Sequence, residues 1–285
     1  MSDRRQVPER LDGIREEVIL HELRATGKVS VRDLAERLNV SEVTIRKDLD
    51  ALEERSLLRR VRGGAVPSAR GEEGAFADRM LMDAAAKRAI AREVAKNVQD
   101  GDSIAIDSST TSYYLAQELV DRDDLIVVTF GLRTAVLLLE QSNATVVMPG
   151  GVVRRASGGM VGSFGNTLAG RGRLGAGFFG TATLSIEHGM LELSSEEAAT
   201  KRALVAVCDE VHVSLASSKI GRFGINSFAS ASEVTRIYTD ELADDAFLHE
   251  WEKVGTPVVR VAGTRSALEA RALSLAGAER EAEAV

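Results

Sequence analysis

The sequence predicts an α/β protein with an N-terminal winged helix-turn-helix followed by a larger domain built on a mostly parallel β-sheet. Three observations support this prediction. Residues 29–48 hold two short amphipathic helical patterns separated by a tight break at Asn39-Val40. An arginine-dense stretch with a glycine pair follows, as in a wing. From Ser103 onward, short apolar strands alternate with helices, which is typical of a parallel sheet covered on both faces.

Both helices of the N-terminal pair have recognisable starts. Ser30 can cap the first, with Asp33 three residues later complementing the exposed amides, and Ser41 can cap the second. Each helix has one face to bury, because apolar residues recur at helical spacing at Val31, Leu34, Ala35 and Leu38 and again at Ile45, Leu49 and Leu52.

The second helix is the candidate recognition helix, because its outward face is polar near the N-terminus, where such helices meet base edges and phosphates. The run Leu57–Gly64 predicts a strand pair with a glycine turn, a wing whose arginines lie near a phosphate backbone. A generic helical hairpin with solvated charges is the alternative, and the wing favours DNA binding over it. The candidate DNA-binding residues are Ser41, Glu42, Thr44, Arg46 and Lys47 in the helix and Arg59, Arg60 and Arg62 in the wing.

The charge differs between the two parts of the chain. The 285 residues have room for one small and one larger domain, and the net charge is −7. Residues 1–70 hold 15 of the 36 Lys and Arg and 13 of the 43 Asp and Glu, a net of +2; the remaining 21 and 30 give −9. A nearly neutral N-terminal domain with local arginine clusters suits sequence-selective contact with DNA. The acidic remainder of the chain limits non-specific binding to DNA.

Several classes of protein are disfavoured by composition. No apolar run approaches the length of a membrane span, and MSDRRQVPER has no signal-peptide core, so a cytoplasmic protein is expected. A single cysteine, Cys208, fits a reducing compartment, and the four histidines lack metal-ligand spacing. We expect no metal site and no cofactor.

The body follows a polar, glycine-containing linker. Expected boundaries are 1–66 for the DNA-binding domain, 67–82 for the linker, 83–262 for the α/β domain and 263–285 for a C-terminal tail. Expected helices are 83–98, 111–120, 132–140 and 195–208, together with a helix-like segment near Trp251. Expected strands are 103–107, 125–129, 145–148 and 211–215.

Polar and glycine-rich segments follow four of these strands, and parallel sheets bind ligands at the carboxyl ends of their strands. These segments are residues 107–111, 129–131, 148–151 and 216–219. The first leads directly into a helix, whose free amides suit a phosphate. Each segment alone is explained as an ordinary turn, but four such segments at the same end of the sheet favour a ligand site.

Lys201 is the most informative single residue of the body. It lies on the apolar stripe of its helix with Ala198, Leu204 and Cys208. A lysine in that position extends its ammonium group to solvent, pairs with a carboxylate such as Glu197 one turn earlier, or serves a ligand. All three explanations are open at this point. Cys208 is expected in the core and not as a nucleophile.

Sequence runs in both parts of the chain also resemble those of a known family. The runs SEVTIRKDL at 41–49 and RGGA at 62–65 are similar to the winged helix of the DeoR family of bacterial transcriptional regulators, with Lys47 and Arg62 as mild departures. The body resembles the family's sensor domain, similar in fold to ribose-5-phosphate isomerases and CoA transferases. Its recognisable features are Lys87, Gly101-Asp102, Asp107 with Thr110-Thr111, Val128-Thr129, Gly150-Gly151, Glu197-Ala198 with Lys201-Arg202, and Ser217-Ser218-Lys219.

The resemblance implies a pocket for a phosphorylated sugar or related metabolite. Three residues at this site depart from the family pattern: Ser109 replaces a common glycine, Phe130 an asparagine, and Ala216 an aspartate. An unusual effector, or loss of effector binding, would explain these departures. The implied effector-binding residues are Asp107, Ser109, Thr110, Thr111, Gly150, Gly151, Lys201 and Lys219.

Two functions are compared. The first is a repressor of sugar metabolism genes that binds double-stranded operator DNA as a homodimer or higher oligomer and is released by its effector. The second is a phosphosugar isomerase-like enzyme in which Lys201 or Lys219 assists proton transfer near Asp107. The arginine wing favours the first, and fold similarity alone is weak support for the second.

Overall fold

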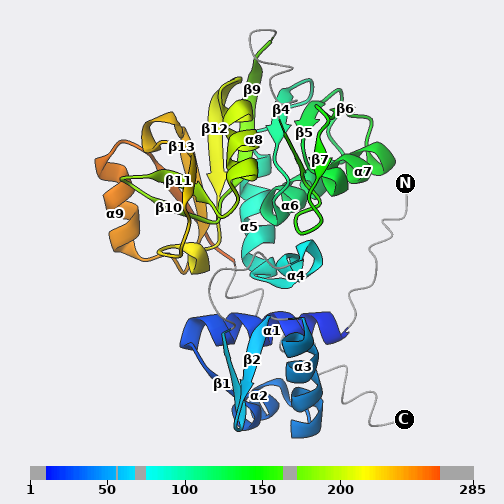
Figure 1. Cartoon of the computed structure of the whole chain (residues 1–285), viewed down its shortest axis with the longest axis vertical. Helices are drawn as coiled ribbons and strands as arrows, with labels where there is room; N and C mark the ends of the chain where they lie inside the picture. Colours follow the sequence, from blue (N-terminus) through cyan, green and yellow to red (C-terminus); the bar gives the residue numbers. More distant parts are fainter. Residues whose placement is uncertain (1–10, 56, 68–74, 163–171, 264–285) are drawn as a thin grey trace. The chain divides into compact units, whose positions relative to one another are not determined.

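The computed structural model describes residues 11–55, 57–67, 75–162 and 172–263. The chain divides into two compact units (Figure 1). The reading unit takes the described residues of Met1–Arg70 and Ala77–Ala84, and the sensor unit takes those of Gly71–Phe76 and Ala85–Thr264.

The reading unit is a winged helix-turn-helix, as predicted. Ser30 caps one helix by accepting a hydrogen bond from the Asp33 backbone, and Ser41 caps the next by accepting one from Thr44. Asn39 ends the first of these helices in the left-handed conformation, with φ of 55°, which produces the tight break. The elements are α1 (Leu11–Thr26), β1 (Val29–Ser30), α2 (Val31–Leu38), α3 (Glu42–Glu54), β2 (Leu58–Val61) and β3 (Gly64–Pro67).

The wing is the β2–β3 hairpin, and β1 adds a third strand to give the order β1-β3-β2. The predicted glycine pair has two different purposes. Gly63 adopts a φ of 78° in the turn. Gly64 lets β3 approach β1, because a Cβ atom there would lie 1.9 Å from the Val29 carbonyl oxygen. A side chain at position 64 would therefore displace the wing.

A buried ion pair holds the recognition helix α3 against α1. Arg15 donates from Nη2 to Asp48 Oδ1 at 2.9 Å and from Nε to Asp48 Oδ2 at 2.5 Å. Both side chains are buried beside the apolar residues Ile45 and Leu49 of α3. A bidentate pair fixes the rotation of α3 as well as its distance from α1.

Arg55 joins three helices within the reading unit. It follows α3 directly and donates to Glu16 of α1 and to Asp78 of α4 (Phe76–Leu81), each at 2.8 Å. The two carboxylates raise the pKa of Arg55 despite the opposing effect of its partial burial. The short helix α4, which the sequence did not predict, is thereby attached to the end of the recognition helix.

The sensor unit contains a seven-stranded sheet in the order β15-β14-β12-β9-β4-β5-β6. Every pairing in it is parallel, as predicted. The strands are β4 (Ser103–Ile106), β5 (Ile126–Thr129), β6 (Thr145–Val147), β9 (Leu174–Gly180), β12 (Cys208–Ser214), β14 (Arg236–Asp240) and β15 (Val258–Val261).

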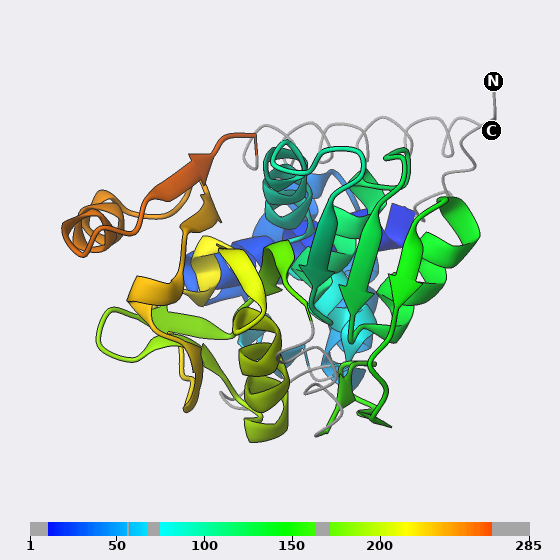
Figure 2. The same cartoon turned by 90° about the horizontal axis from the view of Figure 1, so that it is seen from above.

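Helices cover both faces of this sheet, and Figure 2 shows α8 and α5 on opposite sides of it. Residues of α8 and α9 share a buried core with β9, β12 and β14, centred on large side chains such as Phe179, Phe228 and Trp251. The helices are α5 (Ala84–Ala95), α6 (Thr110–Glu118), α7 (Leu132–Gln141), α8 (Ser195–Val205) and α9 (Asp245–Lys253).

Two smaller sheets complete the sensor unit. Antiparallel β10 (Thr183–Ser185), β11 (Gly189–Glu192) and β13 (Asn226–Ala229) pair in the order β10-β11-β13. The hairpin of β7 (Val152–Val153) and β8 (Met160–Val161) follows β6. The segment 152–161 is called the strap below.

Some sequence expectations need correction. The helix expected at 195–208 ends at Val205, and Cys208 is the first residue of β12, so it does not share a helix stripe with Lys201. It does lie in the core, where burial raises the pKa of its thiol to about 12. Of the tail expected at 263–285, all but Gly263 lies outside the described residues. In the described part of the chain, no helix is both long and apolar enough to cross a bilayer.

Replacing Asp48 by alanine removes the carboxylate that compensates the buried Arg15. We expect the free energy of unfolding of the reading unit to fall by about 3 kcal/mol or more, the usual effect of breaking a buried ion pair. Denaturant unfolding followed by hydrogen exchange at α3 amides measures this. Asp50→Ala is the control, because its side chain is 62% exposed and should contribute less than about 1 kcal/mol. An equal fall in the free energy of unfolding in the two variants would show that the Arg15–Asp48 pair does not stabilise the reading unit.

Candidate nucleic-acid interface and sensor site

The outward face of α3 displays the predicted DNA-binding residues. Ser41, Glu42, Arg46 and Lys47 are exposed, and Thr44 is half-buried beside its cap. Glu42 forms an i,i+4 ion pair with Arg46. In the described part of the chain, Lys47 has no carboxylate partner, so its ammonium group is available to a phosphate or a base.

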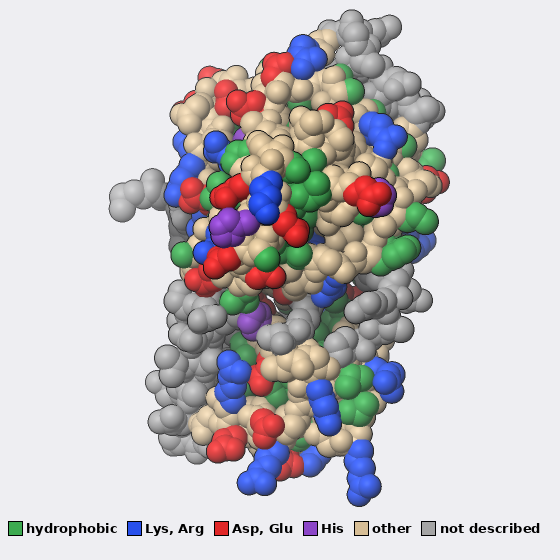
Figure 3. Space-filling view, turned by 90° about the vertical axis from the view of Figure 1, so that its left-hand side faces the viewer, with side chains coloured by type: hydrophobic (Ala, Val, Ile, Leu, Met, Phe, Trp, Pro, Cys, Tyr) green, Lys and Arg blue, Asp and Glu red, His purple; other side chains and the backbone are tan. Residues whose placement is uncertain are grey.

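The three wing arginines are not equivalent. Arg59 and Arg62 are exposed, whereas the Arg60 side chain is 23% exposed and lies 3.5 Å from Asp50 of α3. Figure 3 shows Lys and Arg side chains projecting from the reading unit. The arrangement favours Arg59 and Arg62 over Arg60 as phosphate contacts.

In the sensor unit, the strand order reverses between β9 and β4, which is the point where open α/β sheets bind ligands. Asp107 follows β4, and its carboxylate joins the two strands there. Oδ1 accepts from the Ser109 backbone at 2.9 Å, and Oδ2 accepts from the Gly180 backbone at the end of β9 at 2.8 Å. The predicted segment at 107–111 is thus held rigidly at the switch point.

Helix α8 brings Lys201 to the same point. Its Nζ lies 2.8 Å from Asp107 Oδ2 and donates to Glu192 Oε1 at 2.5 Å and to the Gly180 carbonyl at 2.6 Å. Asp107, Glu192 and Lys201 are 2%, 8% and 6% exposed. An ammonium group has three hydrogens, and each has an acceptor here. We call these three side chains the buried triad.

Two opposing effects set the pKa values of the triad: burial disfavours each charged form, and the opposite charges of the other members favour it. Burial acts to lower the pKa of Lys201, but the charges of Asp107 and Glu192 raise it well above its usual value. Burial acts to raise the pKa of Asp107, but Lys201 and hydrogen bonds from Ser112 and Ser109 lower it. Burial is the larger effect for Glu192, whose pKa is raised.

This geometry does not suit acid–base catalysis by Lys201. Its donors are engaged, and its raised pKa keeps it protonated at neutral pH, so it is not positioned to accept a proton from a substrate. Lys219 donates to the Thr181 carbonyl at 2.8 Å. Both lysines therefore hold the end of β9 and the residue that follows it.

A small cavity adjoins the triad. Its volume is about 10 Å³, room for about one water molecule. Metabolite sites are usually several hundred Å³, so a cavity of this size does not hold a metabolite. Its lining residues are Asp107, Ser108, Phe130, Met160, Glu197, Thr200, Lys201 and Leu204.

The strap closes this cavity. Met160 donates to the Phe130 carbonyl at 2.8 Å, and the Gly158 carbonyl accepts from Leu132 at 3.1 Å. The strap lies directly on the loop after β4, because a Cβ atom on Gly159 would come within 2.6 Å of Ser108 Oγ. A glycine is needed at this contact.

One ion pair joins the strap to α8. Arg154 Nη1 lies 2.6 Å from Glu197 Oε1, and Nε lies 3.8 Å from Glu196. Glu197, considered above as a partner of Lys201, therefore pairs with Arg154 instead. Within the described residues, Glu197 Oε1 is buried and has no hydrogen-bond donor, so Arg154 is its principal compensation.

The structure gathers some of the predicted effector residues and separates others. Asp107, Ser109 and Lys201 meet at the triad, and Lys219 reaches the Thr181 carbonyl beside it. Thr110 and Thr111 begin α6 and are buried. Gly150 and Gly151 follow β6, and neither lines the small cavity.

Sequence reasoning missed several residues of the site. Glu192 and Arg154 come from segments that carried no strand or site prediction, and Ser108 and Thr200 were passed over within predicted segments. The signal available for Arg154 was its place just after the Gly150-Gly151 pair, since a cation beside a flexible backbone suits an anion.

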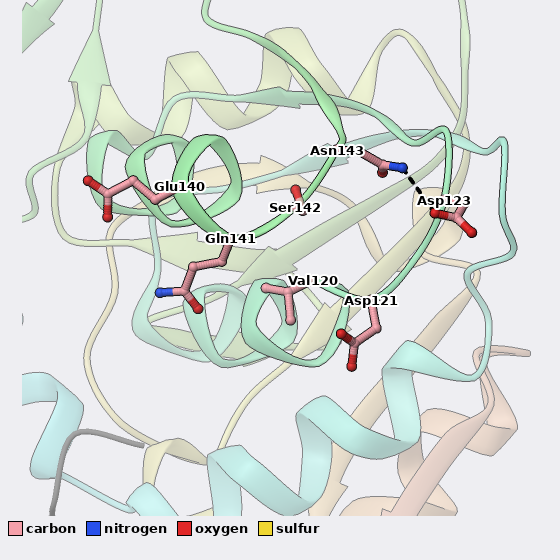
Figure 4. Close-up of a pocket in the computed structure, with 7 residues that line it drawn as sticks. All are labelled: Val120, Asp121, Asp123, Glu140, Gln141, Ser142 and Asn143. Carbon is pink, nitrogen blue, oxygen red and sulfur yellow. Dashed lines mark hydrogen bonds between the residues drawn. The ribbon is translucent and has the colours of Figure 1, made fainter. Parts of the chain in front are cut away.

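A larger concavity, of about 470 Å³, lies at the opposite ends of the strands, beside the N-terminal ends of β5 and β6 (Figure 4). Asp121, Asp123 and Glu140 lie around it, and Asn143 donates to Asp123 at 2.9 Å. Three carboxylates repel a phosphate, so the effector is not expected here.

Comparison with known proteins identifies both units. Residues 15–69 match the DeoR-like helix-turn-helix domain, and residues 82–241 match the DeoR C terminal sensor domain. The chain is 32% identical to the HTH-type transcriptional regulator GolR of Listeria innocua over 245 residues, 86% of this chain and 96% of that protein. It is 31% identical to the glycerol-3-phosphate regulon repressor of Escherichia coli over 222 residues, 78% of this chain and 88% of that protein.

Solved structures give a more distant likeness. A ribose 5-phosphate isomerase from Methanocaldococcus jannaschii aligns over 47% of this chain and 53% of its own, with 14% identity and a TM-score of 0.36.

Replacing Lys201 by methionine leaves two buried carboxylates without their cation. We expect the sensor unit to lose about 3 kcal/mol or more of its free energy of unfolding, measured by thermal or urea denaturation. Lys96→Met is the matched control, because that side chain is 69% exposed and pairs with Glu93 on the surface. A Lys201→Met protein as stable as the control variant would show that the triad does not hold the switch point together.

Proposed function

Because this chain belongs to the DeoR family of transcriptional regulators, we propose that it represses genes of sugar metabolism and is released from its operator by a phosphorylated metabolite. The observation that carries the proposal is the capped helix α3, whose polar N-terminal face is exposed while its other face is buried. The relatives' names support repression, and the sensor family supports release by a ligand.

In the proposed complex, α3 enters the major groove and the wing contacts the backbone. Lys47 is the group best placed to reach DNA from α3, since Arg46 is already paired with Glu42. Arg59 and Arg62 supply the phosphate contacts of the wing. We propose a homodimer or higher oligomer as the binding form, because paired half-sites need paired reading units.

We infer that the effector enters at the strap and replaces Glu197 as the partner of Arg154. A phosphate is a stronger acceptor for a guanidinium group than a single carboxylate. The cavity of about 10 Å³ has no room for a sugar phosphate, so the strap must open for it to bind. The amides at the start of α6 would then face the phosphate.

We infer that α4 passes this change on to the reading unit. Its first residue, Phe76, donates its backbone N–H to the Ala156 carbonyl of the strap at 3.1 Å. Asp78, two residues later, accepts from Arg55 at the end of α3. Opening the strap therefore alters the restraint on a helix that is attached to the recognition helix.

The isomerase-like alternative is not proposed. Proton transfer needs a base placed against the substrate, and all three donors of Lys201 are engaged at the triad. The relatives reported above are regulators of transcription.

For DNA binding, we expect Lys47→Ala to weaken operator affinity about tenfold and to reduce the dependence of affinity on salt by about one counterion. Gel shift with a duplex taken from the DNA upstream of this protein's gene, repeated at several salt concentrations, measures the affinity and its dependence on salt. Lys253→Ala, an exposed lysine of α9 in the sensor unit, removes the same charge and should leave affinity unchanged. Parent-like binding by Lys47→Ala would count against α3 as the reading helix.

For the effector, we expect Arg154→Ala to bind operator normally and to need at least about tenfold more ligand for release, because it loses a charged hydrogen bond. Glu197→Gln weakens the competing pair, so release should need less ligand than in the parent. Fluorescence anisotropy of labelled operator, titrated with phosphorylated trioses, pentoses and hexoses, reports both shifts. Glycerol 3-phosphate is the first ligand to test.

Arg155→Ala is the control for these variants, because Arg155 is an exposed neighbour on the same strap. The exchange of partners at Arg154 is wrong if Arg154→Ala and Arg155→Ala respond to ligand alike.

A further inference from the structure

Val43 is an apolar side chain exposed on the recognition helix. It lies in the first turn of α3, two residues after the cap Ser41, and is 58% exposed. Among the described residues of the reading unit, no other large apolar side chain is comparably exposed. Single exposed apolar residues are common on protein surfaces, but this one lies on the helix that is proposed to meet DNA.

The fold of the reading unit gives Val43 no structural purpose. The positions that staple a helix N-terminus are the residue before the cap and the fourth helical residue, here Val40 and Ile45. Ile45 is fully buried. Capping is supplied by Ser41, and valine is a weaker helix former than many polar residues that suit an exposed site. Helix stability therefore does not explain a valine at position 43.

The neighbours of Val43 are those of a base-reading surface. Lys47 lies four residues later, so the two side chains share one stripe of α3. Lys47 is exposed, and on the adjacent stripe Glu42 and Arg46 pair with each other. The outward face thus offers one apolar group near the start of the helix and one unpaired cation a turn later.

The major groove offers few apolar partners for such a group. The base edges present hydrogen-bond donors and acceptors, and the C5-methyl group of thymine is the apolar exception. We propose that Val43 packs against the methyl group of one thymine in each half-site and so contributes to operator specificity. This inference rests on the proposed DNA-reading function and adds a residue outside the polar set assigned above.

The test is to remove the methyl group from either side of the contact. A duplex is first enriched from a random pool by the full chain, and each of its thymines is then replaced singly by deoxyuridine. We expect the parent to lose about fourfold in affinity at one thymine of each half-site, the effect of one methyl-sized apolar group. Val43→Ala should bind the thymine and uracil duplexes equally.

Two features of the design keep folding and general affinity apart from the contact. Alanine is the best helix former, so Val43→Ala should leave α3 intact. Arg59→Ala serves as the matched control: it weakens binding to every duplex but should keep the parent's sensitivity to uracil.

Several results would overturn the inference while leaving DNA binding in place. These are an enriched half-site without a required thymine, a parent insensitive to every uracil replacement, and a Val43→Ala protein as sensitive as the parent. A Val43→Ala protein that loses affinity for the thymine and uracil duplexes by the same factor keeps the parent's sensitivity to uracil, and this result also overturns the contact. If the parent enriches no duplex at all, the proposed function falls together with the inference.

Discussion

The ammonium group of Lys201 is the interaction on which the sensor unit depends. It lies at the switch point, where the strand order reverses between β4 and β9. Through Asp107, Gly180 and Glu192, this group on α8 holds the loop after β4, the end of β9 and strand β11. Because the group is buried and fully bonded, these elements have one low-energy arrangement. The candidate ligand site, the strap and α8 all take their positions from this point.

The reading unit uses the same physical device on a smaller scale. Arg15 and Asp48 form a buried bidentate pair that sets the rotation of α3. Rotation matters because a helix presents different residues to a groove for each turn about its axis. Exposed pairs such as Glu42 with Arg46 are expected to contribute little to stability, and they are the ones that DNA or ligand can rearrange. Buried pairs hold the frame, and the pair of Arg154 with buried Glu197, whose arginine is 24% exposed, is the one proposed to switch.

The reading unit was the more predictable part from sequence, because its determinants are local. The serine caps, the helical spacing of apolar residues and the glycine turn of the wing each act within a few residues, and each was confirmed in the structure. The contact of Asp48 with Arg15 was not predicted, since 33 residues separate the two. Nothing in the local pattern distinguishes this aspartate from the exposed Asp50.

The sensor unit was predicted in outline, with less success in detail. The parallel sheet follows from alternating short strands and helices, and it was confirmed. Strand β9 was missed because its sequence, LGAGFFG, contains three glycines, which are depleted in strands. Without β9, the switch point could not be located, and helical spacing alone offered Glu197 as one possible partner of Lys201. The true partners come from the loop after β4 and from β11, which only the folded chain brings together.

The central claim is that this chain recognises a particular DNA sequence through its N-terminal unit. The most direct measurement is selection of duplexes from a random pool by the full chain at near-physiological salt, followed by sequencing. The account predicts one enriched motif, repeated at a spacing of about 10 base pairs or a multiple of it. A pool that remains random, or retention that depends on salt and not on sequence, would contradict it.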